Sequence, residues 1–141
     1  AALGAAGPAR SAGAGGVNPS RAAWLSPAMQ TKPTAPATVE VTERNFDALL
    51  AASAAGGILL IDFWAAWCGP CRMVAPEVDK LARQRAGQVV VAKLDTEALP
   101  EVAARYGIQG IPAFIAFRGG REVQRAVGAM SADQLARSLG V

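Results

Sequence analysis

The chain has 141 residues, of which 52% are hydrophobic, and it contains two cysteines, one tyrosine and no histidine. This length fits one domain with a tail. Without histidine the chain cannot form Ser-His or Cys-His nucleophile pairs. Two cysteines can neither complete the four-ligand zinc site that is usual in proteins nor build a scaffold of several disulfides. Chemistry must therefore use the two sulfur atoms, carboxylates, lysine, arginine, the tyrosine or hydroxyl groups.

The net charge of +3 belongs to the N-terminal part of the chain. Residues 1–39 hold three basic residues and no acid, whereas residues 40–141 hold 11 residues of each sign. A neutral body with interspersed charges lacks the basic patch that nucleic-acid binding needs. Its longest charge-free run, residues 48–61, has 14 residues, fewer than the roughly 18 of a membrane-spanning helix. We therefore expect no nucleic-acid partner and no membrane span.

Residues 1–37 are rich in Ala, Gly, Pro and Ser and contain few large apolar side chains. Such a segment cannot bury enough surface to offset the entropy lost on ordering. We expect a disordered extension over residues 1–37 and a folded domain over residues 38–141. The acid-free composition of the extension is also typical of an organellar transit peptide.

Predicted strands and helices alternate along the rest of the chain. Apolar runs and turn residues place strands at residues 38–41, 58–64, 88–94, 112–118 and 122–127. Helical periodicity places helices at residues 43–55, 68–85, 97–106 and 131–139. The order β-α-β-α-β-α-β-β-α predicts an α/β fold with a mixed central sheet and helices on both faces.

Particular residues are expected to set the ends and the buried faces of these helices. Thr42 and Thr96 stand where they would cap the first and third helices, and Ser131 with Gln134 forms a capping box for the last. Pro76 should kink the second helix. The inward face of that helix is expected to hold Met73, Val74, Val78 and Leu81.

The segment Trp67-Cys68-Gly69-Pro70-Cys71 follows the most apolar strand directly and opens a helix. A helix N-terminus has free N–H groups and partial positive charge, so it stabilises a thiolate and lowers the pKa of the first cysteine. Two intervening residues let the second sulfur reach the first across one helical turn. Gly69 would permit the tight turn, and Pro70 is tolerated near a helix start. The pattern favours thiol redox chemistry.

Other interpretations of these residues exist. The cysteine pair could be a structural disulfide, although that loop is too short to restrain the unfolded chain much, or half of a metal site whose remaining ligands are missing. Asp62 lies within an apolar strand, so it is expected to be buried with a raised pKa. It is a satisfied core acid, a residue at the end of the strand, or a proton relay for the second sulfur.

Over about residues 39–141 the sequence resembles the thioredoxin family. The segment W-C-G-P-C at 67–71 matches the active-site motif of that family. Further agreement with the family pattern comes from Asp62-Phe63-Trp64, Pro76, Gly110-Ile111-Pro112, Gly119-Gly120 and Gly128. The resemblance implies the thioredoxin fold and a cis peptide bond before Pro112. The last part of the core is most similar to the thioredoxin 2 subgroup, but residues 1–37 have no cysteine for the N-terminal zinc module that this subgroup often carries.

The resemblance also implies roles for individual residues. Cys68 would attack the disulfide of a client protein, and Cys71 would resolve the mixed disulfide that forms. Asp62 matches the buried acid that relays a proton for the second sulfur. Lys93 matches the lysine that lies near this acid in many thioredoxins.

Pro112 either begins an edge strand or, as the resemblance implies, packs against the cysteine pair in the cis form. In the second case the backbone of Ile111 is free to pair with an extended client segment. The apolar docking surface would then be lined by Trp67, Gly110, Ile111, Pro112 and Gly128. Ala66 and Ala113 depart from residues that are common near this groove, and they leave the fine specificity open.

The function expected from this resemblance is that of a monomeric protein-disulfide reductase without a bound cofactor. It would receive reducing equivalents from NADPH through a thioredoxin reductase and pass them to client proteins. The Gly-Pro pair between the cysteines resembles the reducing members, and the expected location is the cytoplasm, or an organelle stroma or matrix if the extension is a transit remnant. The alternatives are a non-catalytic binding subunit of this fold and an exported disulfide oxidoreductase.

Overall fold

The computed structural model describes residues 37–141. Within them, five strands and four helices follow one another in the predicted order. The strands are β1 (Val39–Glu40), β2 (Ile58–Trp64), β3 (Val89–Asp95), β4 (Ala113–Arg118) and β5 (Arg121–Val127). The helices are α4 (Phe46–Ala54), α5 (Gly69–Gln84), α6 (Pro100–Arg105) and α7 (Ala132–Leu139). Apart from Ala37, the extension predicted for residues 1–37 lies outside the described residues.

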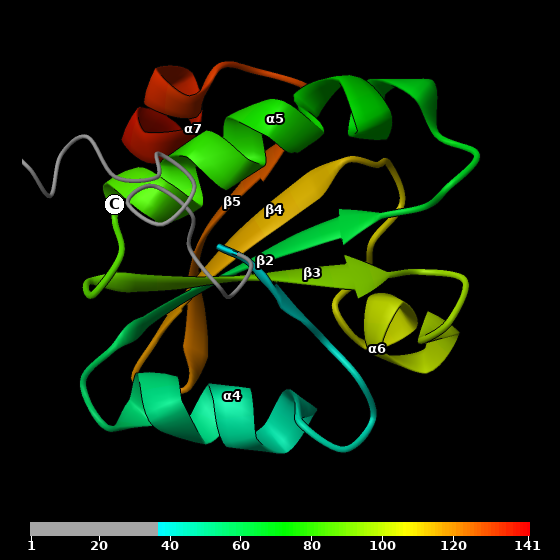
Figure 1. Ribbon diagram of the computed structural model, residues 1–141. Helices are drawn as coiled ribbons and strands as arrows, with labels where there is room; N and C mark the ends of the chain where they lie inside the picture. Colours follow the sequence, from blue (N-terminus) through cyan, green and yellow to red (C-terminus); the bar gives the residue numbers. More distant parts are fainter. Residues whose placement is uncertain (1–36) are drawn as a thin grey trace, which may run out of the picture. The chain divides into compact units, whose positions relative to one another are not determined.

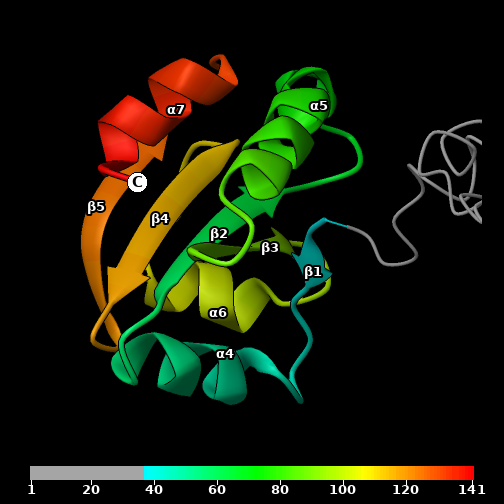
Figure 2. The ribbon, with the colours of Figure 1, turned by 60° about the vertical axis from the view of Figure 1, so that its left-hand side comes forward.

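The strands form one mixed sheet in the order β1-β3-β2-β4-β5. β1, β3 and β2 run parallel, whereas β4 is antiparallel to β2 and β5 is antiparallel to β4. Helices α5 and α7 lie on one face of the sheet, and α4 and α6 lie on the other (Figure 1). Figure 2 shows β1 and β5 at the two edges. This is the α/β architecture that the sequence predicts.

The central strand β2 is buried on both faces, as its apolar run predicts. Side chains alternate along a strand, so Leu59, Ile61 and Phe63 join the core cluster that includes residues of α4 and α6. Leu60 joins the cluster made with α5 and α7. Asp62 points to the same face as Leu60, and it is the one charged residue of the strand. The fold thus places a carboxyl group beneath α5.

Helix α5 corrects one prediction about its inward face. Val74, Val78 and Leu81 are buried as expected, but Met73 is 76% exposed. Buried positions on a helix recur every three or four residues. Cys71, three residues before Val74, is the first buried residue of this series. Met73 lies about 100° around the helix from Val74, so it faces solvent. None of the described helices has the length and apolar character needed to cross a bilayer.

The two predicted threonine caps are wrong. The hydroxyl oxygen of Thr42 accepts hydrogen bonds from the N–H groups of Arg44 and Asn45, but these residues form a turn, and α4 begins only at Phe46. Thr96 donates its hydroxyl to the carbonyl oxygen of Trp64 at 3.3 Å, and α6 begins at Pro100. The Thr42 hydroxyl thus closes a local turn ahead of α4, whereas the Thr96 hydroxyl is bonded to β2, 32 residues earlier in the chain.

The predicted capping box of α7 is confirmed. The Ser131 hydroxyl oxygen accepts the Gln134 N–H at 3.1 Å, and the Gln134 side-chain oxygen accepts the Ser131 N–H at 3.0 Å. A carboxylate oxygen of Glu77 on α5 accepts the N–H of Ala132 at 2.8 Å. The first free N–H groups of α7 are therefore satisfied, and one of these bonds ties α7 to α5.

Candidate active site

The cysteine pair lies where β2 passes into α5. Cys68 is the N-cap of α5 with extended backbone angles, and Gly69 and Pro70 are the first two helical residues. Pro70 needs no partner for its nitrogen at this position. Cys68 and Cys71 form a disulfide with their Cα atoms 5.3 Å apart. The two cysteines of the predicted motif thus lie together at the start of a helix.

One detail of the motif differs from the expectation. Gly69 does not have a positive φ angle, and a Cβ atom at this residue would have nothing within 4 Å. The backbone turn therefore does not require glycine here.

The helix N-terminus is directed at the first sulfur. The Cys71 N–H donates to the Sγ atom of Cys68 at 3.2 Å. A sulfur that accepts this bond at the positive end of the helix dipole is stabilised as a thiolate. Both cysteines are only 4% exposed, and they pack with Ala65, Trp64 and Ile111. The geometry favours thiol–disulfide exchange at Cys68.

The loop that precedes β4 lies against this sulfur. The peptide bond between Ile111 and Pro112 is cis, as the family resemblance implies. The Ile111 carbonyl oxygen lies 3.8 Å from the Cys68 Sγ atom. The N–H of Gly128 donates to the Pro112 carbonyl oxygen at 2.8 Å, which joins this loop to the end of β5. The predicted docking residues of these two loops are therefore adjacent.

Exposed side chains surround the disulfide. Trp67 is 68% exposed, which places it at the rim as expected. Its indole N–H donates to a Glu97 carboxylate oxygen at 3.3 Å. Arg72 donates to the Ala66 carbonyl oxygen at 2.9 Å, which ties the first turn of α5 to the preceding loop. With the exposed Met73, three residues near the motif were missed by sequence reasoning: Arg72, Met73 and Glu97.

The sequence gives a signal for Met73 but none for Glu97. Helical spacing alone could have placed Met73 outside, because it falls between the buried positions of α5. The bond between Glu97 and Trp67 joins residues 30 positions apart, and nothing in the spacing indicates it. Gly110 is exposed beside Val127, and a Cβ atom there would make only an ordinary contact.

Asp62 is the buried acid that the sequence predicts. It is 1% exposed, and its Oδ1 atom has no hydrogen-bond partner. Burial raises the pKa of Asp62 from 3.8 to about 7, and the positive charge of Lys93 lowers it by a smaller amount. Lys93 is the register partner of Asp62 on β3. Its ammonium group lies over the Trp64 ring, 5.1 Å from the ring centre.

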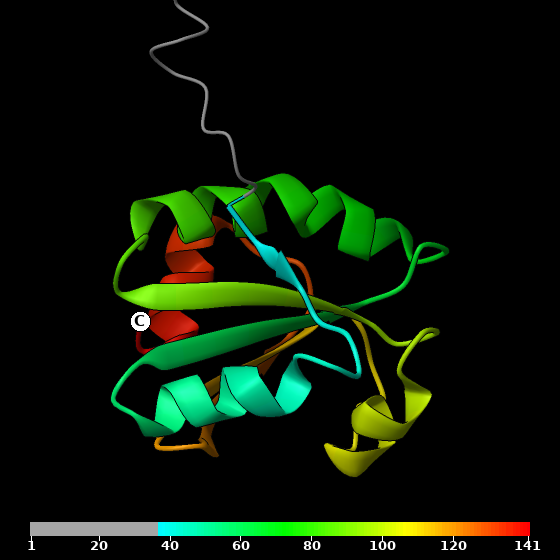
Figure 3. The same cartoon turned by 60° about the horizontal axis from the view of Figure 1, so that its bottom comes forward.

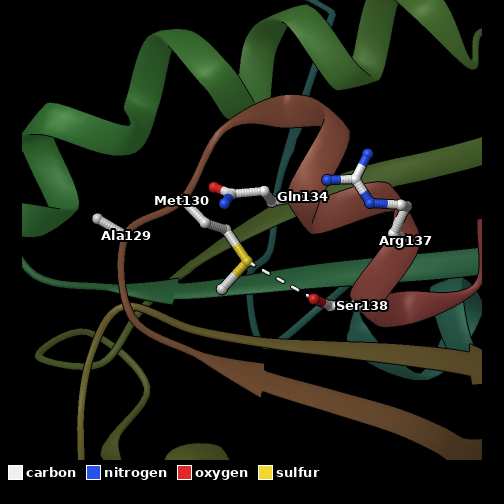
Figure 4. A pocket seen from close by; sticks show the side chains of 5 residues that line it. All are labelled: Ala129, Met130, Gln134, Arg137 and Ser138. Carbon is white, nitrogen blue, oxygen red and sulfur yellow. Dashed lines mark hydrogen bonds between the residues drawn. The ribbon is translucent and has the colours of Figure 1, made fainter.

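Among the hollows on the surface of the described residues, two are open and of similar size. One, of about 350 Å³, is lined by Thr38, Glu40, Trp64 and Lys93. The other, of about 330 Å³, is lined by Ala129, Met130, Gln134, Arg137 and Ser138. In this second hollow the Met130 side chain reaches toward Ser138, whose hydroxyl lies 3.9 Å from the sulfur (Figure 4). The residues that line this second hollow include neither an acid nor a cysteine.

Residues 37–140 match the family model described as Thioredoxin. The chain belongs to the thioredoxin family. It is 49% identical over 81 residues to Thioredoxin 1 of Nostoc sp., which covers 57% of this chain and 76% of that protein. It is 43% identical over 114 residues to the Bifunctional thioredoxin reductase/thioredoxin of Mycobacterium leprae, covering 81% of this chain and 24% of that protein. It is 40% identical over 106 residues to the chloroplastic Thioredoxin M-type of Zea mays, covering 75% of this chain and 62% of that protein.

Membership in this family and the disulfide at the start of α5 establish the activity. This thioredoxin is a thiol-disulfide oxidoreductase that reduces disulfides through the Cys68–Cys71 pair. The family is one whose members are reduced by a thioredoxin reductase and act on client proteins.

Proposed function

We propose that the Cys68 thiolate is the nucleophile and Cys71 the resolving residue. Cys68 attacks one sulfur of a client disulfide; that S–S bond breaks, a mixed disulfide forms, and one client thiolate leaves. Cys71 then attacks the Cys68 sulfur, which forms the Cys68–Cys71 bond and releases the second client thiolate. Two electrons pass from the pair to the client, whose thiolates take up protons. The hydrogen bond from the Cys71 N–H to the Cys68 Sγ atom carries this assignment.

Asp62 takes the proton from Cys71 in the second step. A carboxyl group whose pKa is about 7 can accept a proton near neutral pH, which suits a general base. Burial beneath α5 supports this role, and the free Oδ1 atom is available for a hydrogen bond through water. Lys93 lowers the pKa of this base and so adjusts the pH at which it acts.

An extended segment of the client docks beside the disulfide. The cis peptide bond at Pro112 presents the backbone of Ile111 next to the Cys68 sulfur, where main-chain hydrogen bonds to a client strand could form. The surface is lined by Trp67, Gly110, Ile111, Pro112 and Gly128. Ala66 is exposed beside Trp67 and leaves more room than a larger side chain would, so it is expected to affect the choice of client. Ala113 follows Pro112, but its side chain is buried in the core.

Oxidised protein is returned to the dithiol by a thioredoxin reductase that uses NADPH, and the chain acts as a monomer without a cofactor of its own. A relative whose name combines thioredoxin reductase and thioredoxin supports this partner. We place the chain in the thioredoxin 2 subgroup from the last part of its core. A cytoplasmic location suits a reductase, and an organelle stroma or matrix is the second option, since one relative is named chloroplastic.

The test of the assignment uses insulin as the disulfide substrate and dithiothreitol as reductant. Both Cys68→Ser and Cys71→Ser should lose insulin reduction. Only Cys71→Ser should accumulate a covalent mixed disulfide with insulin, because Cys68 still attacks and nothing resolves the product. A mixed disulfide that forms in Cys68→Ser instead would reverse the assignment. Retained insulin reduction in both variants would favour a binding subunit, and a high reduction potential would favour an exported oxidoreductase.

A further inference from the structure

Three ionisable side chains form a row across the parallel half of the sheet. Glu40 is the register partner of Lys93 between β1 and β3, and Lys93 is the partner of Asp62 between β2 and β3. Figure 3 shows β2 and β3 running side by side. Partners on neighbouring strands point to the same face and lie about 4.8 Å apart. All three residues therefore share the face that α5 covers, with Lys93 between the two acids.

The outer end of this row opens into a pocket. Glu40 and Lys93 line the 350 Å³ hollow together with Thr38 and Trp64. This volume is ample for several water molecules. Glu40 lies on the exposed edge strand β1, at the solvent side of the pocket. Asp62 lies on the inner side of Lys93, with a carboxylate oxygen that no protein group satisfies.

We propose that Glu40 is a positioning residue for disulfide exchange, and that the pocket it lines is the path by which the Asp62 carboxyl group returns its proton to solvent. Glu40 attracts the Lys93 ammonium toward the pocket and so limits how far Lys93 stabilises the Asp62 carboxylate. A carboxylate stabilised less by Lys93 is a stronger base toward the Cys71 thiol. This inference rests on the proposed relay function of Asp62.

Few other charged groups face Asp62. On β3 the next residue of the same face is Asp95, whose Oδ1 atom accepts the N–H of Glu97 at 2.9 Å. On β4 the register partner is the neutral Phe114. From α5 the cysteine pair faces the site, and the remaining buried residues of this helix are apolar.

The charged side chains of α5 nearest to its first turns are occupied elsewhere. Arg72 donates to the Ala66 carbonyl oxygen, and Glu77 accepts the N–H of Ala132. Among residues 37–141, Glu40 is thus the acid that shares a pocket with Lys93. The other acid on this face, Asp95 of β3, does not line the pocket.

The experiment compares the pH dependence of insulin reduction in Glu40→Gln and in wild-type protein at low ionic strength. Glu40 lies two strand spacings, about 10 Å, from Asp62. In a medium with a dielectric constant of about 40–80, one charge at this distance shifts the titration of the Asp62 carboxyl group by roughly 0.3–0.6 pH unit. Removing the Glu40 charge should therefore shift the midpoint of the pH profile downward by this amount. Glu40→Asp should restore it, and 1 M salt should suppress the difference because Glu40 is exposed.

Glu43→Gln is the matched control, since it removes the same charge from an exposed turn residue that does not line the pocket. A midpoint that is unchanged in Glu40→Gln, or equally shifted in Glu43→Gln, would overturn the inference. So would a Glu40→Gln shift that persists in an Asp62→Asn background. If Asp62→Asn itself keeps the wild-type pH profile, the relay function fails. If Asp62→Asn removes the titration from the pH profile of insulin reduction but Glu40→Gln does not shift its midpoint, only the role of Glu40 fails.

Discussion

Asp62 and Lys93 are register partners on adjacent parallel strands, yet they form no ion pair. Within residues 37–141, the one ion pair closer than 4 Å joins Arg125 to Glu122. The Lys93 ammonium rests over Trp64 instead, so the loss of hydration dominates and the pKa of Asp62 rises to about 7. The protein thus carries a desolvated acid beneath α5, the helix that begins at the cysteine pair.

Asp62→Asn should stabilise the oxidised protein at alkaline pH. The folded state holds the Asp62 proton up to about pH 7, whereas the unfolded chain loses it near 3.8. Between these values the native state binds more protons, so wild-type stability falls as pH rises. The gap corresponds to roughly 4 kcal/mol at pH 8, at 1.36 kcal/mol per pK unit. Below about pH 4 this contribution disappears.

Urea unfolding of both oxidised proteins at pH 4 and pH 8 measures this effect. The exposed Asp47→Asn provides a control in which a charge is removed without relief of burial. A variant Asp62→Asn that is less stable than wild type at pH 8 would contradict the burial argument.

Lys93→Met should act in the opposite direction to loss of Glu40. The Lys93 charge lowers the pKa of Asp62, so its removal raises this pKa above about 7. The midpoint of the pH profile for insulin reduction should then move to more alkaline pH, and activity at pH 7 should fall. Lys80→Met, an exposed lysine on α5, is the control. An acid shift in Lys93→Met would show that Lys93 does not act on Asp62 by its charge.

The sequence contains the information for local features. The apolar run of residues 58–64 matches β2 residue for residue, because a strand that is buried on both faces needs an almost continuous run of apolar side chains. The capping box at Ser131 can likewise be predicted from four consecutive residues, 131–134. The motif at 67–71 predicts the disulfide, since two residues between cysteines leave their sulfurs within one helical turn.

Relationships between distant segments could not be predicted. The row from Glu40 through Lys93 to Asp62 depends on the register of three strands, and a shift of one residue would turn Lys93 to the other face. The threonines at 42 and 96 have the right chemistry for caps, but their turns close before the helices begin. For Thr96 the competing partner is the Trp64 carbonyl oxygen on β2, which the sequence around Thr96 does not indicate.

Met73→Ala should reduce activity toward proteins without loss of stability. Met73 is 76% exposed near the disulfide, so its truncation should change the free energy of unfolding by less than about 0.5 kcal/mol. As an apolar contact for a docked client, it should lower kcat/KM for insulin about fivefold, which corresponds to about 1 kcal/mol. Reduction of a small aromatic disulfide should be unchanged. Val123→Ala, exposed in the middle of β5, is the control, and an equal loss in both variants would remove Met73 from the docking surface.

Ser53→Ala should destabilise the fold by about 1–3 kcal/mol, because Ser53 joins α4 to the hairpin between β4 and β5. Its hydroxyl donates to the Leu50 carbonyl oxygen at 2.8 Å and accepts the Gly120 N–H at 3.1 Å. The φ angles of Gly119 and Gly120 are +63° and +78°, so this two-residue turn is held in a conformation that few residues adopt. Thermal unfolding at neutral pH measures the loss. The exposed Ser138→Ala should change stability by less than about 0.5 kcal/mol, and equal effects in the two variants would show that the Ser53 hydroxyl does not anchor the hairpin.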